Sequence, residues 1–290
     1  MKKKVFRIPY LGYHTRAYVL GDLSNGIPLI ILHGGPGGCV ERYEPLEKLA
    51  DFGIPLIFYD QLGCGYSRVP KNHKIDWNFQ VFLDELQNLI EYFNLKKYHL
   101  LGHSWGGMLA LEFVCNFEHN GLEKMILFST LPSTKLWNDE HIKLFSNFTP
   151  SEQEALLAEK EGKPYDKIQY KNAVKKFMRN HVGRRSKDLY AFERKRFPKI
   201  NREIYGKMWG KSEFFGTGTL SDWSVEDKLS QIDVKTLIIS GTFDESTPEM
   251  NKLMNEQIPG SKWVLLKESH HIGYVEEVET TLSAIKDFIL

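Results

Sequence analysis

The chain has 290 residues, enough for one large α/β domain or a core with a smaller module. Its 38 basic and 37 acidic residues leave a net charge of +1, so no global field selects nucleic acid or an anionic membrane as the main partner. No apolar run approaches the roughly 18 residues that span a bilayer, and the charged opening MKKKVFRIPY has no apolar stretch behind it. We therefore expect a cytoplasmic protein with no membrane or nucleic-acid partner.

Cysteine usage also favours a reducing compartment. The three cysteines are odd in number and widely spaced, at Cys39, Cys64 and Cys115. This pattern favours reduced thiols over a disulfide framework or a zinc site. The ten histidines show no HExxH pattern, so we expect no metal and no cofactor.

Short apolar runs alternate with helical patterns along most of the chain. The runs predicted as buried strands are residues 29–32, 56–59, 98–101, 125–128, 236–239 and 262–266. Apolar residues recur at helical spacing in residues 77–93, 108–113 and 275–290. The order strand, helix, strand predicts an α/β fold with a mostly parallel sheet.

The alternation stops between residues 133 and 222, where only helical stretches rich in charged and aromatic residues occur. This segment holds 19 basic and 12 acidic residues, so it is basic while the rest of the chain is acidic. We predict a core formed by residues 1–132 and 223–290, with residues 133–222 inserted as a helical cap. Attraction between a basic cap and an acidic core explains the charge better than a nucleic-acid site, because no nucleic-acid motif accompanies it.

A candidate nucleophile lies in GHSWGG, residues 102–107. Ser104 follows a predicted strand and precedes a predicted helix, which is the context that G-x-S-x-G requires for a strained turn that exposes the serine. Ser104 alone could equally be a helix N-cap. However, HGGPG at residues 33–37 resembles the HGGG-type loop that supplies an oxyanion-hole amide. The two motifs together favour a nucleophilic serine.

A catalytic acid should follow the serine in the chain, on a loop after a later strand. Asp244 in GTFDESTP meets this condition, since it follows the strand predicted at 236–239. Asp60 also ends a predicted strand but precedes Ser104, and its glycine-rich neighbours are typical of a tight turn. Glu245 is a third candidate because it adjoins Asp244.

Three histidines are candidates for the base. His103 adjoins the serine, but consecutive residues at such a turn point in different directions, so a buried or hydrogen-bonded role suits it better. His270 and His271 both follow the last predicted strand. A histidine there could take the proton of the serine and pass it to the leaving group.

Five segments spread over most of the chain carry a family resemblance: HGGPG at 33–37, YDQLGCGYS at 59–67, GHSWGG at 102–107, EFFGTGTLSDW at 213–223 and GTFDESTP at 241–248. Together they resemble the proline iminopeptidases, or prolyl aminopeptidases, which are α/β-hydrolases with an inserted helical cap. The first, third and fifth segments are shared with wider hydrolases. The second and fourth are more specific to this family.

The resemblance implies roles for particular residues. Ser104 would be the nucleophile and Asp244 the acid. The backbone amides of Gly35 and Trp105 would form the oxyanion hole.

The resemblance also separates the two adjacent histidines. The histidine of the family typically lies five residues before an acidic residue that opens the final helix. His271 has this spacing to Glu276, whereas His270 occupies a position that commonly holds a small residue. The expected base is therefore His271, and His270 is expected to shape the loop.

An aminopeptidase differs from an esterase in recognising a free amino group, which calls for carboxylates near the acyl pocket. The two glutamates that the family uses match Glu213 and Glu245 here, with Tyr205 as a further substrate-binding candidate. Large aromatic residues could wall a pocket for a proline ring or could pack the core of the insert. They are Trp137, Trp209, Phe214, Phe215 and Trp223.

The resemblance thus predicts a serine aminopeptidase that releases an N-terminal residue, preferentially proline. It would act through an acyl-enzyme intermediate on short peptides or amino-acid amides with a free N-terminus. Two alternatives stay open. One is a small-molecule esterase or amidase that needs no free amine, and the other is a non-catalytic binding protein with a hydrolase fold.

Overall fold

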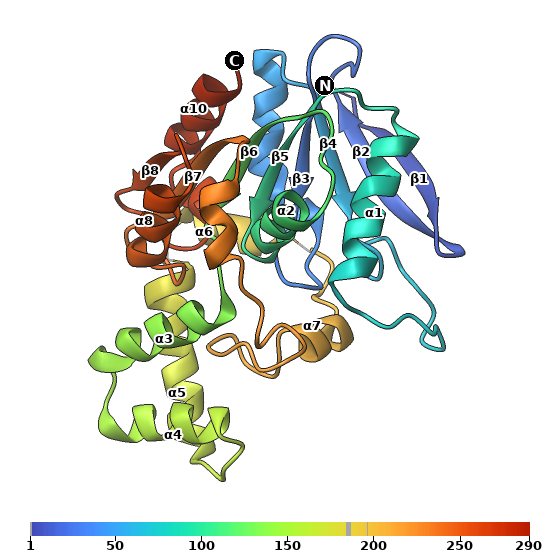
Figure 1. Ribbon diagram of the computed structural model, residues 1–290. Helices are drawn as coiled ribbons and strands as arrows, with labels where there is room; N and C mark the ends of the chain where they lie inside the picture. Colours follow the sequence, from blue (N-terminus) through green and yellow to red (C-terminus); the bar gives the residue numbers. More distant parts are fainter. Residues whose placement is uncertain (1, 184–186, 196) are drawn as a thin grey trace.

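The computed structural model describes residues 2–183, 187–195 and 197–290 (Figure 1). Its strands form one sheet in the order β1-β2-β4-β3-β5-β6-β7-β8. All neighbours from β4 to β8 are parallel, and only β1 and β2 run antiparallel to their neighbours. The strands are β1 (Lys4–Tyr10), β2 (Tyr13–Leu20), β3 (Leu29–Leu32), β4 (Leu56–Asp60), β5 (Tyr98–His103), β6 (Leu122–Phe128), β7 (Lys235–Gly241) and β8 (Lys262–Leu266).

Helices connect the strands and cover both faces of the sheet (Figure 1). The helices that cover the two faces of the sheet are η1 (Val40–Phe52), α1 (Phe79–Tyr92), α2 (Trp105–Asn116), η4 (Glu226–Gln231), α8 (Pro248–Gln257), α9 (Gly273–Glu276) and α10 (Val278–Ile289). The helices that lie between β6 and η4 in the chain are α3 (Thr134–Leu144), η2 (Phe145–Asn147), α4 (Pro150–Lys160), α5 (Lys167–Phe177), η3 (Met178–Val182), α6 (Lys187–Glu193) and α7 (Arg202–Met208). Among the described residues, no helix is both long enough and apolar enough to cross a bilayer.

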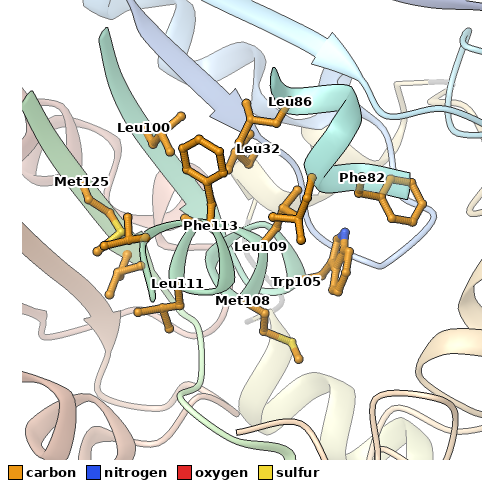
Figure 2. Packing of buried hydrophobic residues seen from close by; sticks show 14 of the residues in the cluster. Leu32, Phe82, Leu86, Leu100, Trp105, Met108, Leu109, Leu111, Phe113 and Met125 are labelled. Atoms are coloured by element: carbon orange, nitrogen blue, oxygen red, sulfur yellow. The ribbon is translucent and has the colours of Figure 1, made fainter. Parts of the chain in front are cut away.

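The core is divided by the sheet because successive strand residues point to opposite faces. In β3, Ile30 and Leu32 belong to the cluster that contains α1, α2 and α8, whereas Leu29 and Ile31 belong to the cluster that contains η1 and α10. Figure 2 shows the first cluster, where side chains of α2 fill the space between α1 and the sheet. Both faces of the central strands are apolar, which explains why they appear in the sequence as continuous hydrophobic runs.

The structure confirms the predicted α/β fold and every predicted strand, with ends that shift by a few residues. The hairpin of β1 and β2 is not predicted by the sequence pattern. Its loop is Leu11-Gly12, with φ of 47° and 77°, and leucine at the first loop position is not a recognised hairpin signal. β1 lies at the edge of the sheet, so Val5 stays 58% exposed and the apolar alternation is weak.

The helical segment between β6 and β7 leaves the sheet and returns to it at one point. Ser133 and Ser224 form an isolated antiparallel bridge, and the Val225 N–H donates to the Pro132 carbonyl at 2.9 Å. Helices α3, α4, α5 and α7 lie together at one end of the sheet, at the bottom of Figure 1. A separate apolar cluster of this segment is formed by Phe145, Phe148, Leu156, Ala173, Phe177, Phe214 and Phe215.

Candidate active site

Ser104 lies at a sharp turn between the end of β5 and the start of α2. Its φ of 54° and ψ of −121° are strained for a residue with a side chain. Close packing makes the flanking glycines necessary, because a methyl group at Gly102 would collide with the Gly106 carbonyl and one at Gly106 would collide with the Leu32 carbonyl. Within the described residues, the Ser104 hydroxyl caps no N–H group of α2. The N-cap alternative therefore does not explain this serine, and the turn matches a nucleophile elbow.

Asp244 and His271 meet where the loops after β7 and β8 come together. The Asp244 Oδ1 atom lies 2.8 Å from His271 Nδ1 and also accepts the Ser246 N–H at 2.8 Å. The Asp244 Oδ2 atom accepts the Gly241 N–H at 3.3 Å. Because Asp244 is fully buried and has these partners, its carboxylate can fix the orientation and tautomer of the imidazole.

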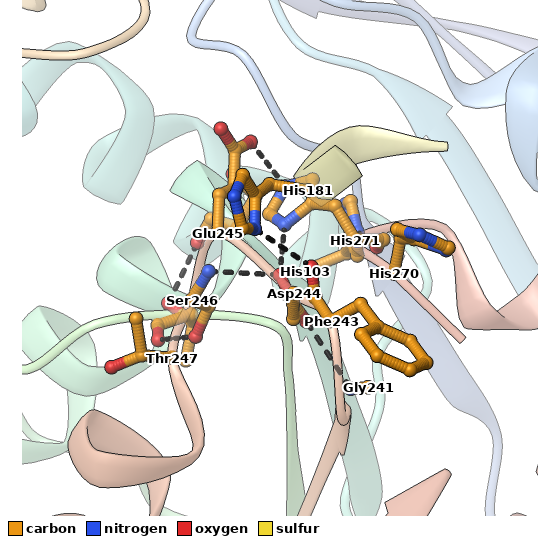
Figure 3. A network of polar contacts seen from close by, with 12 residues as sticks. His103, His181, Gly241, Phe243, Asp244, Glu245, Ser246, Thr247, His270 and His271 are labelled. Atoms are coloured by element: carbon orange, nitrogen blue, oxygen red, sulfur yellow. Dashed lines mark hydrogen bonds and ion pairs between the residues drawn. The ribbon is translucent and has the colours of Figure 1, made fainter. Parts of the chain in front are cut away.

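His270 lies apart from this pair. Figure 3 shows Asp244, Glu245 and His271 gathered together, while the ring of His270 points to the side of Phe243. The carboxylate of Glu276 holds His270, accepting its backbone N–H at 2.7 Å and lying 3.1 Å from its Nδ1. Glu276 thus fixes the loop through His270 and leaves the next residue, His271, directed at Asp244.

His103 takes part in a buried hydrogen-bond chain between two loops. Its Nε2 donates to the His271 carbonyl at 2.8 Å, so its Nδ1 accepts from the Tyr43 hydroxyl, also at 2.8 Å. The Tyr43 hydroxyl oxygen in turn accepts the Gly34 N–H at 2.8 Å. Burial holds the pKa of His103 well below its usual value, and His271 adds to the shift. His103 is therefore a neutral link between the HGGPG loop and the His271 loop.

The rival acid Asp60 is occupied elsewhere. Its carboxylate accepts the N–H groups of Val40 and Tyr66 at 2.9 Å each and lies 3.5 Å from Arg16. A side chain at Gly65 would collide with it. Asp60 therefore organises the turn after β4, whereas Asp244 Oδ1 lies 2.8 Å from His271 Nδ1.

The candidate oxyanion donors come from two loops that Gln61 joins. Gln61 accepts the Trp105 indole N–H at 2.8 Å and donates its amide to the His33 carbonyl at 3.1 Å. Trp105 is the first residue of α2, so its backbone N–H belongs to the unpaired N-terminal end of a helix, which favours negative charge. Gly35, with φ of 131°, is a position that glycine tolerates best.

A cavity of about 500 Å³ contains the candidate groups. Ser104, His271, Glu213, Glu245 and Tyr205 all line it. The Tyr205 hydroxyl donates to Glu213 Oε2 at 2.7 Å. The Glu245 Oε1 atom lies 3.5 Å from His271 Nε2, while its Oε2 is buried without a partner in the described structure. An unpaired buried carboxylate oxygen in a cavity is a ready acceptor for a bound cation.

The helical segment between β6 and β7 holds the loops that carry Glu245 and His271. The His181 carbonyl accepts the N–H of Glu245 at 3.1 Å and that of His271 at 3.3 Å. His141 Nε2 donates to the Glu245 carbonyl at 3.1 Å. These bonds fix the backbone of Glu245 beside His271.

The charges of Glu245 and His271 are coupled. Burial alone would lower the pKa of His271, but Glu245 and then Asp244 raise it to about 9. Burial raises the pKa of Glu245 well above its usual range, and His271 opposes that rise. We assign the shared proton to His271, because a buried carboxylate at 3.5 Å favours the imidazolium.

The large aromatic residues of the insert pack mainly on one another. Phe214 and Phe215 belong to the apolar cluster of the helical segment. Trp137 packs edge to face on Trp209, with ring centroids 5.6 Å apart, and Trp223 packs against Phe79. The described walls of the cavity come from other residues, so these aromatics do not form the expected wall of the pocket.

Two residues important for this arrangement were not predicted from the sequence as members of the site. Gln61 lies in the YDQLGCGYS block, which could have pointed to it. Tyr43 has no motif around it, and only the folded position of η1 brings its hydroxyl to Gly34 and His103.

Comparisons with known proteins agree with this geometry. Residues 27–278 match the family model of the alpha/beta hydrolase fold. A proline iminopeptidase of Lactiplantibacillus plantarum is 35% identical over 285 residues, which cover 97% of this chain and 99% of that protein. The crystal structure of VinJ has a TM-score of 0.85 and 32% identity, covering 99% of this chain and 98% of that one. The crystal structure of a proline iminopeptidase from Mycobacterium smegmatis has a TM-score of 0.84 and 29% identity, covering 99% and 97%.

Proposed function

Since this chain belongs to the proline iminopeptidases of the α/β-hydrolase fold, we propose that it is a serine aminopeptidase that releases an N-terminal residue, preferentially proline, from short peptides. One observation carries this proposal. The cavity that Ser104 and His271 line is also lined by Glu213 and Glu245, and Asp244 contacts His271 from behind the cavity lining. A nucleophile beside two carboxylates suits an acyl group that carries an ammonium ion.

Ser104 and His271 line the same cavity, which supports the proposed roles of nucleophile and base. Ser104 Oγ attacks the scissile carbonyl as its proton passes to His271 Nε2, and Asp244 stabilises the imidazolium. The carbonyl oxygen becomes an oxyanion that accepts the N–H groups of Gly35 and Trp105. One such donor typically contributes about 3 to 4 kcal/mol to transition-state stabilisation.

The imidazolium then gives its proton to the leaving nitrogen, and the carbon–nitrogen bond breaks. An acyl-enzyme on Ser104 remains. Water then attacks this ester with His271 again as the base. The free amino acid is released, and the hydroxyl of Ser104 is regenerated.

Recognition of the amino group is assigned to Glu213, Glu245 and Tyr205. The unpaired Oε2 of Glu245 would accept an N–H of the ammonium ion. Tyr205 orients Glu213 through the bond between its hydroxyl and Glu213 Oε2. An acylated or otherwise neutral N-terminus would bring no cation to these two carboxylates, which is unfavourable in a buried site.

The cap is part of the same proposal. Residues 133–222 form a helical cap on a core of residues 1–132 and 223–290, which the paired ends of the segment support. Such a cap limits the site to short substrates. A cytoplasmic location remains a prediction from the sequence.

A fluorophosphonate probe and two substrate types test the proposal. We expect the probe to label Ser104 in the wild-type enzyme and not after Ser104→Ala, and we expect prolyl p-nitroanilide to be hydrolysed. Equal or better turnover of p-nitrophenyl esters would instead support the esterase alternative. Absence of labelling would support a non-catalytic binding protein.

A further inference from the structure

A second cavity, of about 580 Å³, adjoins the first. The residues that line both are Arg42, Met178, Val182, Ile272 and Tyr274. Ser104, Glu213 and Glu245 line only the first cavity. A peptide whose amino group contacts the glutamates and whose carbonyl contacts Ser104 can therefore extend past the shared wall into the second cavity.

Arg42 is the charged residue on this shared wall. It is exposed, and its guanidinium lies 5.2 Å from the centre of the Phe197 ring. The neighbouring carboxylates have other partners, since Glu41 pairs with Arg16 and Glu44 with Lys195. In the described structure the charge of Arg42 is thus left without a carboxylate of this chain.

The charge of Arg42 reaches the cavity interior. Burial raises the pKa of Tyr43 and Tyr274, and Arg42 opposes the rise at both. Both tyrosines line the first cavity. Arg42 is therefore close enough to act on a group bound there.

The second cavity also has a basic side. Lys175 and Arg179 line it, against the single acidic residue Glu193 in the described lining. The first cavity is lined by Glu213 and Glu245 and also by the cations Lys199 and Arg202. The second cavity thus has an excess of cations, whereas the carboxylates lie mainly in the first cavity.

We propose that Arg42 binds the α-carboxylate of the leaving fragment, so that the preferred substrates are dipeptides and tripeptides with a free C-terminus. A short peptide is a zwitterion, with its ammonium ion at one end and its carboxylate at the other, and it complements this arrangement of charges. The inference rests on the proposed aminopeptidase function. Guanidinium suits this ligand because it binds a carboxylate through two parallel N–H donors.

The apolar part of the shared wall strengthens the interaction. Met178, Val182, Ile272 and Tyr274 line the same two cavities as Arg42. A carboxylate bound among these side chains would lose part of its water, so the attraction would be screened less than on an open surface. Because the contact is remote from the reacting atoms, its loss should raise KM more than it lowers kcat.

Lys199 provides a matched control. It is an exposed cation that lines the first cavity but not the second, and it borders a different cavity with Gly63, Gly65 and Arg68. If the leaving fragment extended in that direction, Lys199 and not Arg42 would select the carboxylate.

The test measures kcat/KM on Pro-Gly, Pro-Gly-Gly and their C-terminal amides, with prolyl p-nitroanilide as the reference. The wild-type enzyme should prefer the free acid at one of the two lengths. Arg42→Gln should reduce kcat/KM on that acid by about tenfold and leave the amide and the anilide within about twofold. Arg42→Lys should retain part of the preference, and Lys199→Gln should retain all of it.

The proposal is overturned if wild type shows no difference between acid and amide at either length, if the difference survives in Arg42→Gln, or if Lys199→Gln abolishes it. Retained anilide hydrolysis shows that each variant is folded. If wild type hydrolyses neither the anilide nor any of the peptides, the proposed function itself fails and this inference fails with it.

Discussion

The contact between Glu245 and His271 predicts that a substitution at Glu245 speeds the hydrolysis of one class of substrate, whereas active-site substitutions usually slow hydrolysis. Glu245→Gln removes one charge 3.5 Å from His271 Nε2 and keeps the shape of the side chain. Glu245 and Asp244 together raise the pKa of His271 to about 9 against the effect of burial. The base must be neutral to accept a proton, so removing the charge of Glu245 should favour the active form of His271 near neutral pH.

The size of the effect follows from these values. With a pKa of about 9, roughly 1% of His271 is neutral at pH 7. Removing an adjacent opposite charge lowers a pKa by about 1 to 3 units, which would bring His271 near 7 and make roughly half of it neutral. Glu245→Gln should therefore speed hydrolysis of an amine-free ester at pH 7 by about tenfold or more.

Prolyl substrates should respond in the opposite direction. Their ammonium ion loses one carboxylate partner, and a hydrogen bond between charged groups contributes about 1.5 to 3 kcal/mol. KM for prolyl p-nitroanilide should therefore rise about tenfold to a hundredfold. The same variant thus becomes a better esterase and a poorer aminopeptidase.

The assay is the pH profile of kcat/KM from pH 5 to 10, with p-nitrophenyl acetate and prolyl p-nitroanilide. The limb that rises with pH reports the ionisation of His271, and it should move to lower pH in Glu245→Gln. Glu249→Gln, at an exposed position on α8, makes the same change in net charge and should leave the profile in place. A limb that stays where it is in Glu245→Gln, or moves to higher pH, would refute the reasoning.

Three further predictions concern the same site. Glu213→Gln should raise KM for prolyl substrates at least about tenfold with little effect on p-nitrophenyl esters, and equal effects on both substrates would exclude a role in binding the amine. Tyr43→Phe leaves the Gly34 N–H and His103 Nδ1 without their buried partner. The value of kcat should therefore fall by roughly tenfold while KM stays nearly unchanged. A change in KM alone would argue against a positioning role. His271→Ala should lower kcat by about three orders of magnitude or more. His270→Ala should keep most of the activity and lose about 1 kcal/mol of unfolding free energy. The reverse order of activities would exchange the two assignments.

The fold and the family could be predicted from the sequence because their signals are local. Buried parallel strands appear as apolar runs, and a nucleophile elbow needs glycines next to its serine within five residues. The structure confirms the predicted strands and the mostly parallel sheet, and the relatives confirm the family. The edge hairpin escaped prediction because an exposed edge strand needs little apolar alternation and its Leu-Gly turn lacks the usual residues.

The remaining features depend on contacts between residues far apart in the chain. Tyr43 reaches His103 across 60 positions, and His103 reaches the His271 carbonyl across 168. Neither pair leaves a pattern in a single sequence, because a hydrogen bond requires only that two groups meet in space. The same holds for Arg42, whose position on the wall between two cavities depends on how η1 lies against η3 and the His271 loop.

The role of His270 shows how the structure sharpens a sequence argument. The spacing of five residues between His271 and Glu276 marks the expected base. In the folded chain, Glu276 accepts the backbone N–H of His270 at 2.7 Å and lies 3.1 Å from His270 Nδ1. The acidic residue supports the base indirectly, by fixing the neighbour that precedes it.

The most direct measurement of the central claim compares kcat/KM of the wild-type enzyme for prolyl p-nitroanilide and N-acetylprolyl p-nitroanilide. The two substrates share the same scissile bond and differ in the free amine. If Glu213 and Glu245 bind the ammonium ion, acetylation should lower kcat/KM by about a hundredfold or more, since it leaves both carboxylates without their cation. Comparable values for the two substrates would contradict an aminopeptidase and favour an amidase with no need for a free amine.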